Sequence, residues 1–324
     1  MNLNNKKYME DKMKRFLVIS LALILPFVLF SCKSNVVEPD SLDDTVLASL
    51  IENEDALINF EENFDDGDAT TFYIGKINTD LYPIKVGRKI TKIERSFDRQ
   101  VVGDSAKVTI TTTFTGNLII AGKLTPITPG DTSYRPDTVV TKPFVETVKR
   151  NVTFIRTNPK NDKNRGWKLQ AISLPEGSTS LRNIKINKVE LSVANRDTLI
   201  ITSPLDTYFF IGDPKKDFPE RKKNDEIVLK VYLTSNSPKE DFVTITYGRK
   251  ISGQTYKVKR KLSLVSSTQV GDKWEKIYQG NWNIFVLHPY GKFHSVINAV
   301  TNETIFSVEG SVSSSTWGIP YKVN

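Results

Sequence analysis

Apolar residues follow a helical period near the N-terminal end of the chain and a strand period over most of the rest. In 42–64 they recur every three or four positions, with acidic residues between them. This pattern predicts one amphipathic helix, with Ser41 at its N-cap and Asp44 three residues later as in a capping box. The helix is expected to end at Asp65-Asp66-Gly67-Asp68. The apolar positions are Val46, Leu47, Leu50, Ile51, Leu57, Ile58 and Phe64.

From Phe72 onward apolar residues recur at every second position, which is typical of strands with one buried face. Between Ala106 and Phe114, for example, apolar and polar residues alternate. A helix followed by about six strands predicts an α+β domain over 42–174. The predicted strands are Val86–Phe97, Ala106–Phe114, Leu118–Ala121, Val145–Arg156 and Trp167–Leu174, with a further one after Phe72.

The segment 175–183 is polar and holds Pro175 and Gly177, so it is predicted to be a linker. After it, seven or eight short apolar runs separated by turn residues predict an all-β domain over 184–324. Strands at this spacing are typical of an immunoglobulin-like β-sandwich, although the Cys…Trp…Cys pattern is absent. The predicted strands are Ile184–Val193, Thr198–Ser203, Tyr208–Ile211, Ile227–Thr234, Phe242–Tyr247, Tyr256–Val265, Trp274–Phe285 and Phe293–Ala299.

Residues 1–32 have the organisation of a secretory signal, with Lys14 and Arg15 before an apolar run from Phe16 to Phe30. Leu29-Phe30-Ser31-Cys32 resembles the lipobox of bacterial lipoproteins. That resemblance implies export, acylation of Cys32 and anchoring in the bacterial cell envelope, on the outer membrane, with 33–41 as a short tether. The alternative, an uncleaved N-terminal anchor helix, stays open.

Charge is distributed unevenly along the chain. The segment 33–68 holds twelve acidic residues and one basic residue, whereas 69–324 carries a net charge of +16. A basic body can attract an anionic partner or a membrane surface, or the acidic segment can fold back and neutralise it. Because Cys32 is the single cysteine, the rest of the chain has no disulfide, thiolate nucleophile or cysteine-based metal site.

The first predicted domain also carries a weak family motif. An acidic helix followed by long strands that end in Gly166-Trp167-Lys168-Leu169, with Ile172 beyond, is similar to NTF2-like domains. The resemblance implies helices packed into a cone-shaped sheet. Enzymes of that family line the cone with His and Asp, and 42–174 contains no histidine, so the resemblance implies a non-catalytic member.

Motifs for common enzyme classes are absent from the sequence, and no cofactor is predicted. Two features with possible chemistry have ordinary alternatives. His288 and His294 flank a turn and can form a pair, or can be unrelated loop residues. The acidic group Glu61, Glu62, Asp65, Asp66 and Asp68 has the composition of a cation site without its spacing, so no metal site is predicted.

Two kinds of binding surface remain as candidates. Lys257, Lys259 and Lys261 share one strand face, and Trp317 and Tyr321 lie near the C-terminus. These residues predict contact with an envelope protein or an acidic glycan. Nucleic-acid binding is not predicted, because aromatic residues are not interleaved with the lysines. A second basic group is Arg88, Lys89, Lys92 and Arg95.

The leading functional hypothesis is a non-enzymatic, lipid-anchored envelope protein that acts through such contacts. One alternative is a small-ligand carrier or an enzyme with a pocket in the first domain, lined by Arg95, Glu146 and Arg156 from inward strand positions. The other alternative is glycan binding through exposed aromatic residues of the second domain. A deep polar pocket favours the first alternative, and a row of exposed aromatic side chains favours the second.

Overall fold

The computed structural model describes residues 41–53, 55–71, 80–126, 135–157, 164–193, 196–213, 217–251 and 254–324. All of them belong to one compact unit, residues 39–324. The predicted signal peptide 1–32 with Cys32, and all of the tether except Ser41, lie outside the described residues. Among the helices that are described, none has the length and apolar character needed to cross a membrane.

The described chain is mostly β-structure: a curled antiparallel half-barrel sheet and a second antiparallel sheet. The helical elements are α2 (Ser41–Glu52), α3 (Asp55–Phe64), the 3-10 helix η2 (Pro204–Asp206) and α4 (Asn302–Phe306). The strands are β1 (Thr70–Thr71), β2 (Tyr82–Val102), β3 (Ser105–Lys123), β4 (Thr138–Arg156), β5 (Trp167–Ser173), β6 (Glu176–Thr179), β7 (Ile184–Val193), β8 (Leu199–Ile201), β9 (Tyr208–Phe210), β10 (Glu220–Arg221), β11 (Glu226–Ser235), β12 (Phe242–Tyr247), β13 (Lys250–Ile251), β14 (Gln254–Thr255), β15 (Val258–Lys261), β16 (Ser263–Val270), β17 (Lys273–Asn283), β18 (Gly291–Val300) and β19 (Ser314–Val323).

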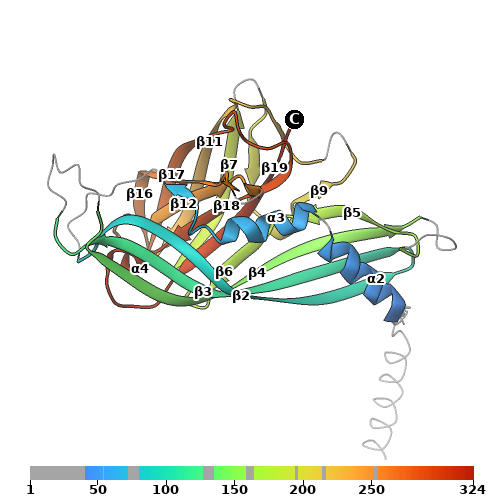
Figure 1. Ribbon diagram of the computed structural model, residues 1–324, viewed down its shortest axis with the longest axis horizontal. Coiled ribbons are helices and arrows are strands. Elements are labelled where there is room, and N and C mark those ends of the chain that lie inside the picture. The colour runs from blue at the N-terminus through green and yellow to red at the C-terminus, as the bar shows by residue number, and fades with distance from the viewer. Residues whose placement is uncertain are drawn as a thin grey trace, which may run out of the picture. The chain divides into compact units, whose positions relative to one another are not determined.

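Three long strands, β2, β3 and β4, form the curled part of the large sheet and pair antiparallel along their length (Figure 1). Side chains alternate along β3 and along β4 up to Arg150, so the even-numbered residues of these two strands point to the buried, concave face. The register places Arg95 opposite Thr112, and Thr112 opposite Val148. Residues far apart in the sequence therefore form rows across one concave surface.

The acidic segment forms two helices, α2 and α3, where the sequence pattern predicts one. The first ends at Glu52, and the Asn53 side chain donates a hydrogen bond to the Ser49 carbonyl oxygen at 2.7 Å. Asparagine is a poor residue for a helix interior because its amide competes for backbone partners, and here it does so where the helix stops. Leu47 and Ile51 of α2 and Phe60 and Phe64 of α3 are buried against the sheets.

Strand β3 runs without a break through Gly116, where the sequence pattern predicts two strands separated by Gly116-Asn117. An added Cβ on Gly116 would lie 2.5 Å from the Lys89 carbonyl oxygen of the neighbouring strand. The register of β2 shifts between Ile90 and Lys92 at the same place. Glycine therefore marks a bulge and a close backbone approach in a continuous strand.

The predicted linker 175–183 contributes β6 to the large sheet. This strand pairs with β4 on one side and with the C-terminal strand β19 on the other. The order of the main path is β1-β15-β12-β18-β19-β6-β4-β3-β2, so strands from both predicted domains form one sheet. Sequence pattern does not reveal this pairing, because the paired residues are far apart in the chain: Thr316 of β19 pairs with Gly177 of β6, 139 residues earlier.

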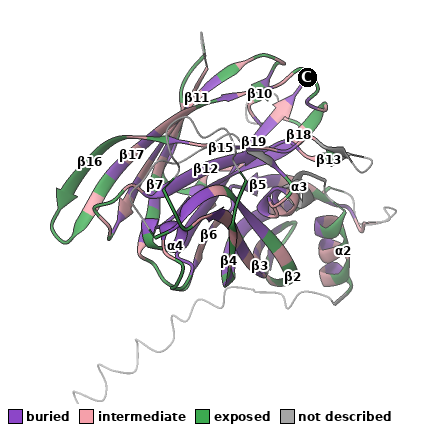
Figure 2. Cartoon of the chain, turned by 60° about the vertical axis from the view of Figure 1, so that its left-hand side comes forward, coloured by how far each residue is buried: buried purple, intermediate pink, exposed green. Residues whose placement is uncertain are grey.

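The second sheet has the order β16-β17-β11-β7-β8. The predicted strand Tyr256–Val265 is divided at the buried Leu262, with β15 joining the large sheet and β16 the second sheet. Buried residues of both sheets form a shared core that includes Trp167, Leu229, Trp282 and Tyr321. Figure 2 shows this burial pattern, and also that the edge strand β16 is largely exposed.

Candidate ligand pocket beneath helices α2 and α3

A cavity of about 150 Å³ lies between the two helices and the concave face of the half-barrel sheet. Helices α2 and α3 supply one wall, and β2, β3 and β4 supply the other. Its lining combines five apolar residues with six polar or charged ones, so it offers both an apolar surface and groups that can orient a ligand. The lining residues are Ile51, Glu52, Phe60, Glu61, Arg95, Ile110, Thr112, Val148, Lys149, Arg150 and Pro175.

Arg150 reaches the pocket because it occupies an even-numbered, inward position of β4. Its neighbours on the same face of this strand are Val148 and Val152, both buried. Across the sheet it lies opposite Ile110 of β3. The strand alternation therefore places a guanidinium group beside buried aliphatic side chains, where only 6 % of the residue is exposed.

The Arg150 guanidinium is a buried cation that lacks acceptors. It lies over the Phe60 ring, 5.3 Å from the centroid. Among the residues that the structure describes, no hydrogen-bond acceptor reaches its Nε or its Nη2. Burial lowers the pKa of Arg150 to about 9, against the attraction of Glu61, so the group remains protonated at neutral pH. Buried charges in proteins are normally paired, because desolvation without compensation is costly.

Arg95 lines the same pocket but is already paired. Its Nε donates to Oε1 of Glu61 at 2.7 Å, and its Nη2 contacts Oε2 of the same carboxylate. This two-point contact with Glu61 raises the pKa of Arg95. Both oxygens of the Glu61 carboxylate therefore contact Arg95, and Glu61 affects Arg150 only by electrostatic attraction at longer range.

Of the three residues predicted to line a pocket, only Arg95 does so. Glu146 is buried two inward positions before Arg150, and its Oε2 accepts a hydrogen bond from the Ser314 hydroxyl at 2.8 Å. Burial raises the pKa of this carboxyl. Arg156 pairs with Asp43 of α2 and lies over the Trp167 ring at 4.3 Å. Both side chains are inward as expected, yet neither borders the cavity.

The acidic residues of 41–68 pair with the basic body, as one of the two sequence-based alternatives predicts. Asp44 lies 3.3 Å from Arg99, and Asp43 pairs with Arg156 and Arg165. These contacts hold α2 against the end of the half-barrel. Acidic residues in the first turn of α2 also interact favourably with the helix dipole. In the residues that the structure describes, no group of three His, Cys, Asp or Glu side chains is arranged to hold a metal ion.

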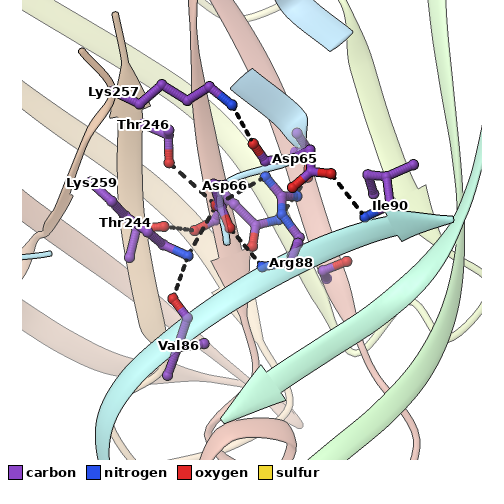
Figure 3. A network of polar contacts seen from close by, with 12 residues as sticks. Asp65, Asp66, Val86, Arg88, Ile90, Thr244, Thr246, Lys257 and Lys259 are labelled. Carbon is purple, nitrogen blue, oxygen red and sulfur yellow. Dashed lines mark hydrogen bonds and ion pairs between the residues drawn. The ribbon is translucent and has the colours of Figure 1, made fainter. Parts of the chain in front are cut away.

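Asp66, in the loop after α3, is fully buried and contacts two strands near opposite edges of the large sheet, β2 and β15 (Figure 3). Its Oδ1 accepts the Arg88 backbone N–H at 2.7 Å. Its Oδ2 lies 3.0 Å from Lys259 Nζ and 3.5 Å from Arg88 Nη2. Burial alone would raise the pKa of Asp66, but Lys259 and Arg88 outweigh it and hold the pKa below its ordinary value.

Two of the three predicted surface lysines lie inside the protein. Lys259 pairs with Asp66, while Lys257 donates to the carbonyl oxygens of Glu62 and Asp65 at 2.9 and 2.8 Å. Lys257 thereby satisfies the Glu62 carbonyl in the last turn of α3 and the Asp65 carbonyl directly after the helix. Lys261 is more exposed and lies 2.8 Å from Glu240. The strand face shared by these lysines is therefore an internal ionic surface, a result that composition alone does not reveal.

The predicted aromatic and histidine candidates are also buried. Trp317 and Tyr321 of β19 are within the core. His288 Nε2 lies 2.8 Å from the Tyr321 hydroxyl, and burial lowers the pKa of His288. His294 packs edge-on against Phe218, with ring centroids 5.2 Å apart. The two imidazoles thus have separate neighbours.

Sequence reasoning overlooked Arg150, Phe60 and Thr112 as pocket residues. Arg150 could have been identified from the sequence. Like Glu146, it is a charged residue at an even-numbered position of β4, and these positions point inward. Phe60 and Thr112 carry no comparable signal, because an apolar helix position and a strand threonine are common in any core. Searches with this sequence find no matching protein-family model and no matching curated protein.

Proposed function

We propose that this chain is a non-catalytic, small-ligand-binding protein of the bacterial cell envelope that holds its ligand in the pocket beneath α2 and α3. The observation that carries the proposal is the buried, unpaired Arg150 guanidinium in a cavity lined by both apolar and polar side chains. Polar groups that converge in a concave site beside apolar side chains are usual features of a binding site. This is the carrier alternative of the sequence analysis, with Arg150 as its principal polar residue.

Location in the envelope is proposed from the signal segment and the lipobox-like Leu29-Phe30-Ser31-Cys32, with anchoring to the outer membrane by a lipid on Cys32. An NTF2-like relationship for the first half is proposed as well. It is supported by helices that pack on the concave face of a curled sheet. An immunoglobulin-like character for the second half stays a prediction, supported by its antiparallel strands.

The leading hypothesis from sequence was contact with an envelope protein or an acidic glycan. Lys257, Lys259, Trp317 and Tyr321 offer little exposed surface for it, since each is at most 4 % exposed. The pocket is therefore the better supported of the two hypotheses.

The proposal is tested by native mass spectrometry of the full-length protein extracted from its own membranes in mild detergent. A small molecule bound at one per chain is expected in the wild type and in Thr113→Phe, and absent from Thr112→Phe. Thr112 lines the cavity, whereas Thr113 is the next residue of the same strand and points to the other face. Wild-type protein that binds no small molecule from membranes or from added extracts would contradict the proposal.

A further inference from the structure

The pocket contains one buried positive charge, that of Arg150, with no direct ion pair in the described structure; the other lining cation beside Arg95, Lys149, is exposed to solvent. Arg95 is matched by Glu61 in a two-point contact, and the remaining acidic lining residue, Glu52, is exposed at the rim. Arg150 has only the longer-range attraction of Glu61, and its Nε and Nη2 donate to nothing in the described structure. A guanidinium group presents paired N–H donors that match the two oxygens of a carboxylate.

The size and lining of the cavity restrict the rest of the ligand. A cavity of about 150 Å³ has the volume that accommodates a benzene molecule in a protein core, so a body of about six carbon atoms fits. The apolar wall is formed by Ile51, Phe60, Ile110 and Val148, all buried. Each buried methylene group contributes about 0.8 kcal/mol of favourable transfer free energy.

Thr112 adds a buried residue with a hydroxyl group to the lining of the site. It is one row from Arg150 on the concave face, since Thr112 pairs with Val148 and Ile110 pairs with Arg150. A hydroxyl can donate to an oxygen acceptor or accept from a donor, so it is compatible with a ligand that carries a carboxylate.

We propose that the ligand is a small organic monoanion, a carboxylate with an apolar body of about six carbon atoms, whose oxygens pair with Arg150. The assignment rests on the proposed function and narrows it to one ligand class. The structural alternative is that Arg150 is held only by its contact with Phe60 and by the attraction of Glu61. Binding measurements separate these two roles.

The test is isothermal titration calorimetry of the full-length chain in mild detergent, with detergent alone as the blank and with hexanoate, hexan-1-ol and hexylamine as probes. The three probes have the same chain length of six carbon atoms and differ in the charge of the head group. Hexanoate is expected to bind at least tenfold more tightly than hexan-1-ol, because a hydrogen bond to a charged group contributes more than a neutral one. Hexylamine is expected to show no binding.

Arg150→Gln is expected to lower the affinity for hexanoate at least tenfold while leaving that for hexan-1-ol within about twofold. Arg182→Gln removes an exposed arginine outside the pocket and should change neither value. The comparison of probes in the wild type does not depend on how well any variant folds.

Two results would overturn the assignment, and they differ from failure of the proposed function. Equal affinity of the wild type for hexanoate and hexan-1-ol would leave a ligand pocket but exclude anion recognition. Unchanged hexanoate binding by folded Arg150→Gln would exclude Arg150 as the recognition group. If none of the probes binds and native mass spectrometry finds no ligand, the proposed function itself is contradicted.

Discussion

At the scale of single residues, the buried cations of the described structure differ in how their charge is compensated. Lys259 and Arg88 share the Asp66 carboxylate, which compensates their burial. Arg150 receives no comparable partner. An isolated buried charge is expected where a ligand supplies the missing partner, whereas a satisfied one is expected where it stabilises the fold.

Asp66→Asn is expected to lower the free energy of unfolding by about 3–5 kcal/mol at pH 7, because it leaves buried cations without an anion. The folded state holds the pKa of Asp66 below its ordinary value of 3.8. Its contribution is therefore fully present above that pH and is lost as the pH falls through the folded-state pKa. Urea unfolding of both proteins should show a difference that is constant near neutrality and shrinks below about pH 4.

Asp68→Asn provides the control for this prediction. Asp68 pairs with Lys257, but its side chain is 40 % exposed, so the loss is expected to be below about 1 kcal/mol. A difference between wild type and Asp66→Asn that grows on acidification would contradict the assigned role of Asp66.

Gly318→Ala tests the packing beneath the pocket. A Cβ at this position would overlap the Pro175 ring and lie 2.9 Å from Phe60 Cδ2, so the variant is expected to lose about 1–3 kcal/mol of stability. Gly280→Ala is the matched control, because its Cβ meets the movable end of the Leu262 side chain and should cost less. Thermal unfolding that ranks the two variants in the opposite order would reject this account.

At the scale of elements, strand alternation decides which side chains reach the pocket, and much of it can be read from sequence. The alternating runs around Ala106–Phe114 and Val145–Arg156 correctly predict strands with inward even positions. The division of the acidic segment into α2 and α3 was not predicted, since the apolar spacing on both sides of Asn53 suits one helix. Gly116 was misread as a strand end because a bulge and a turn have the same local signal.

Helix α2 is expected to depend on Asp43 more than on Asp44. Asp43 is buried and contacts Arg156 and Arg165, while the Asp44–Arg99 pair is partly exposed. Asp43→Asn should cost about 3 kcal/mol and Asp44→Asn less than about 1 kcal/mol. Hydrogen exchange should then accelerate in the amides of α2 in the first variant and remain unchanged in β3. Equal acceleration in both variants would argue against this anchoring of α2.

At the scale of the whole molecule, the folding of the acidic segment onto the basic body follows from charge and is foreseeable as one of two alternatives. The continuity of the large sheet is not foreseeable, because the pairings of β6 with β4 and β19 depend on contacts distant in sequence. The burial of Lys257 and Lys259 has the same cause: their partners, such as Asp66, lie nearly 200 residues away.

Lipid anchoring is a prediction for the whole chain. Cys32→Ser is expected to abolish incorporation of a clickable palmitate analogue and to move the protein from the membrane fraction to the soluble fraction, because acylation requires the thiol. Ser31→Ala changes a neighbouring residue and should leave both unchanged. Retention of Cys32→Ser in the membrane fraction would favour the anchor-helix alternative.

The most direct test of the central claim observes Arg150 itself. Nuclear magnetic resonance of the ¹⁵N-labelled full-length chain follows the arginine Nε–H signals during titration with hexanoate, and Arg150→Gln identifies the signal of this residue. The account predicts that the Arg150 signal shifts and becomes protected from exchange, with saturation at one equivalent. An Arg150 signal that stays unchanged while hexanoate binds would contradict it.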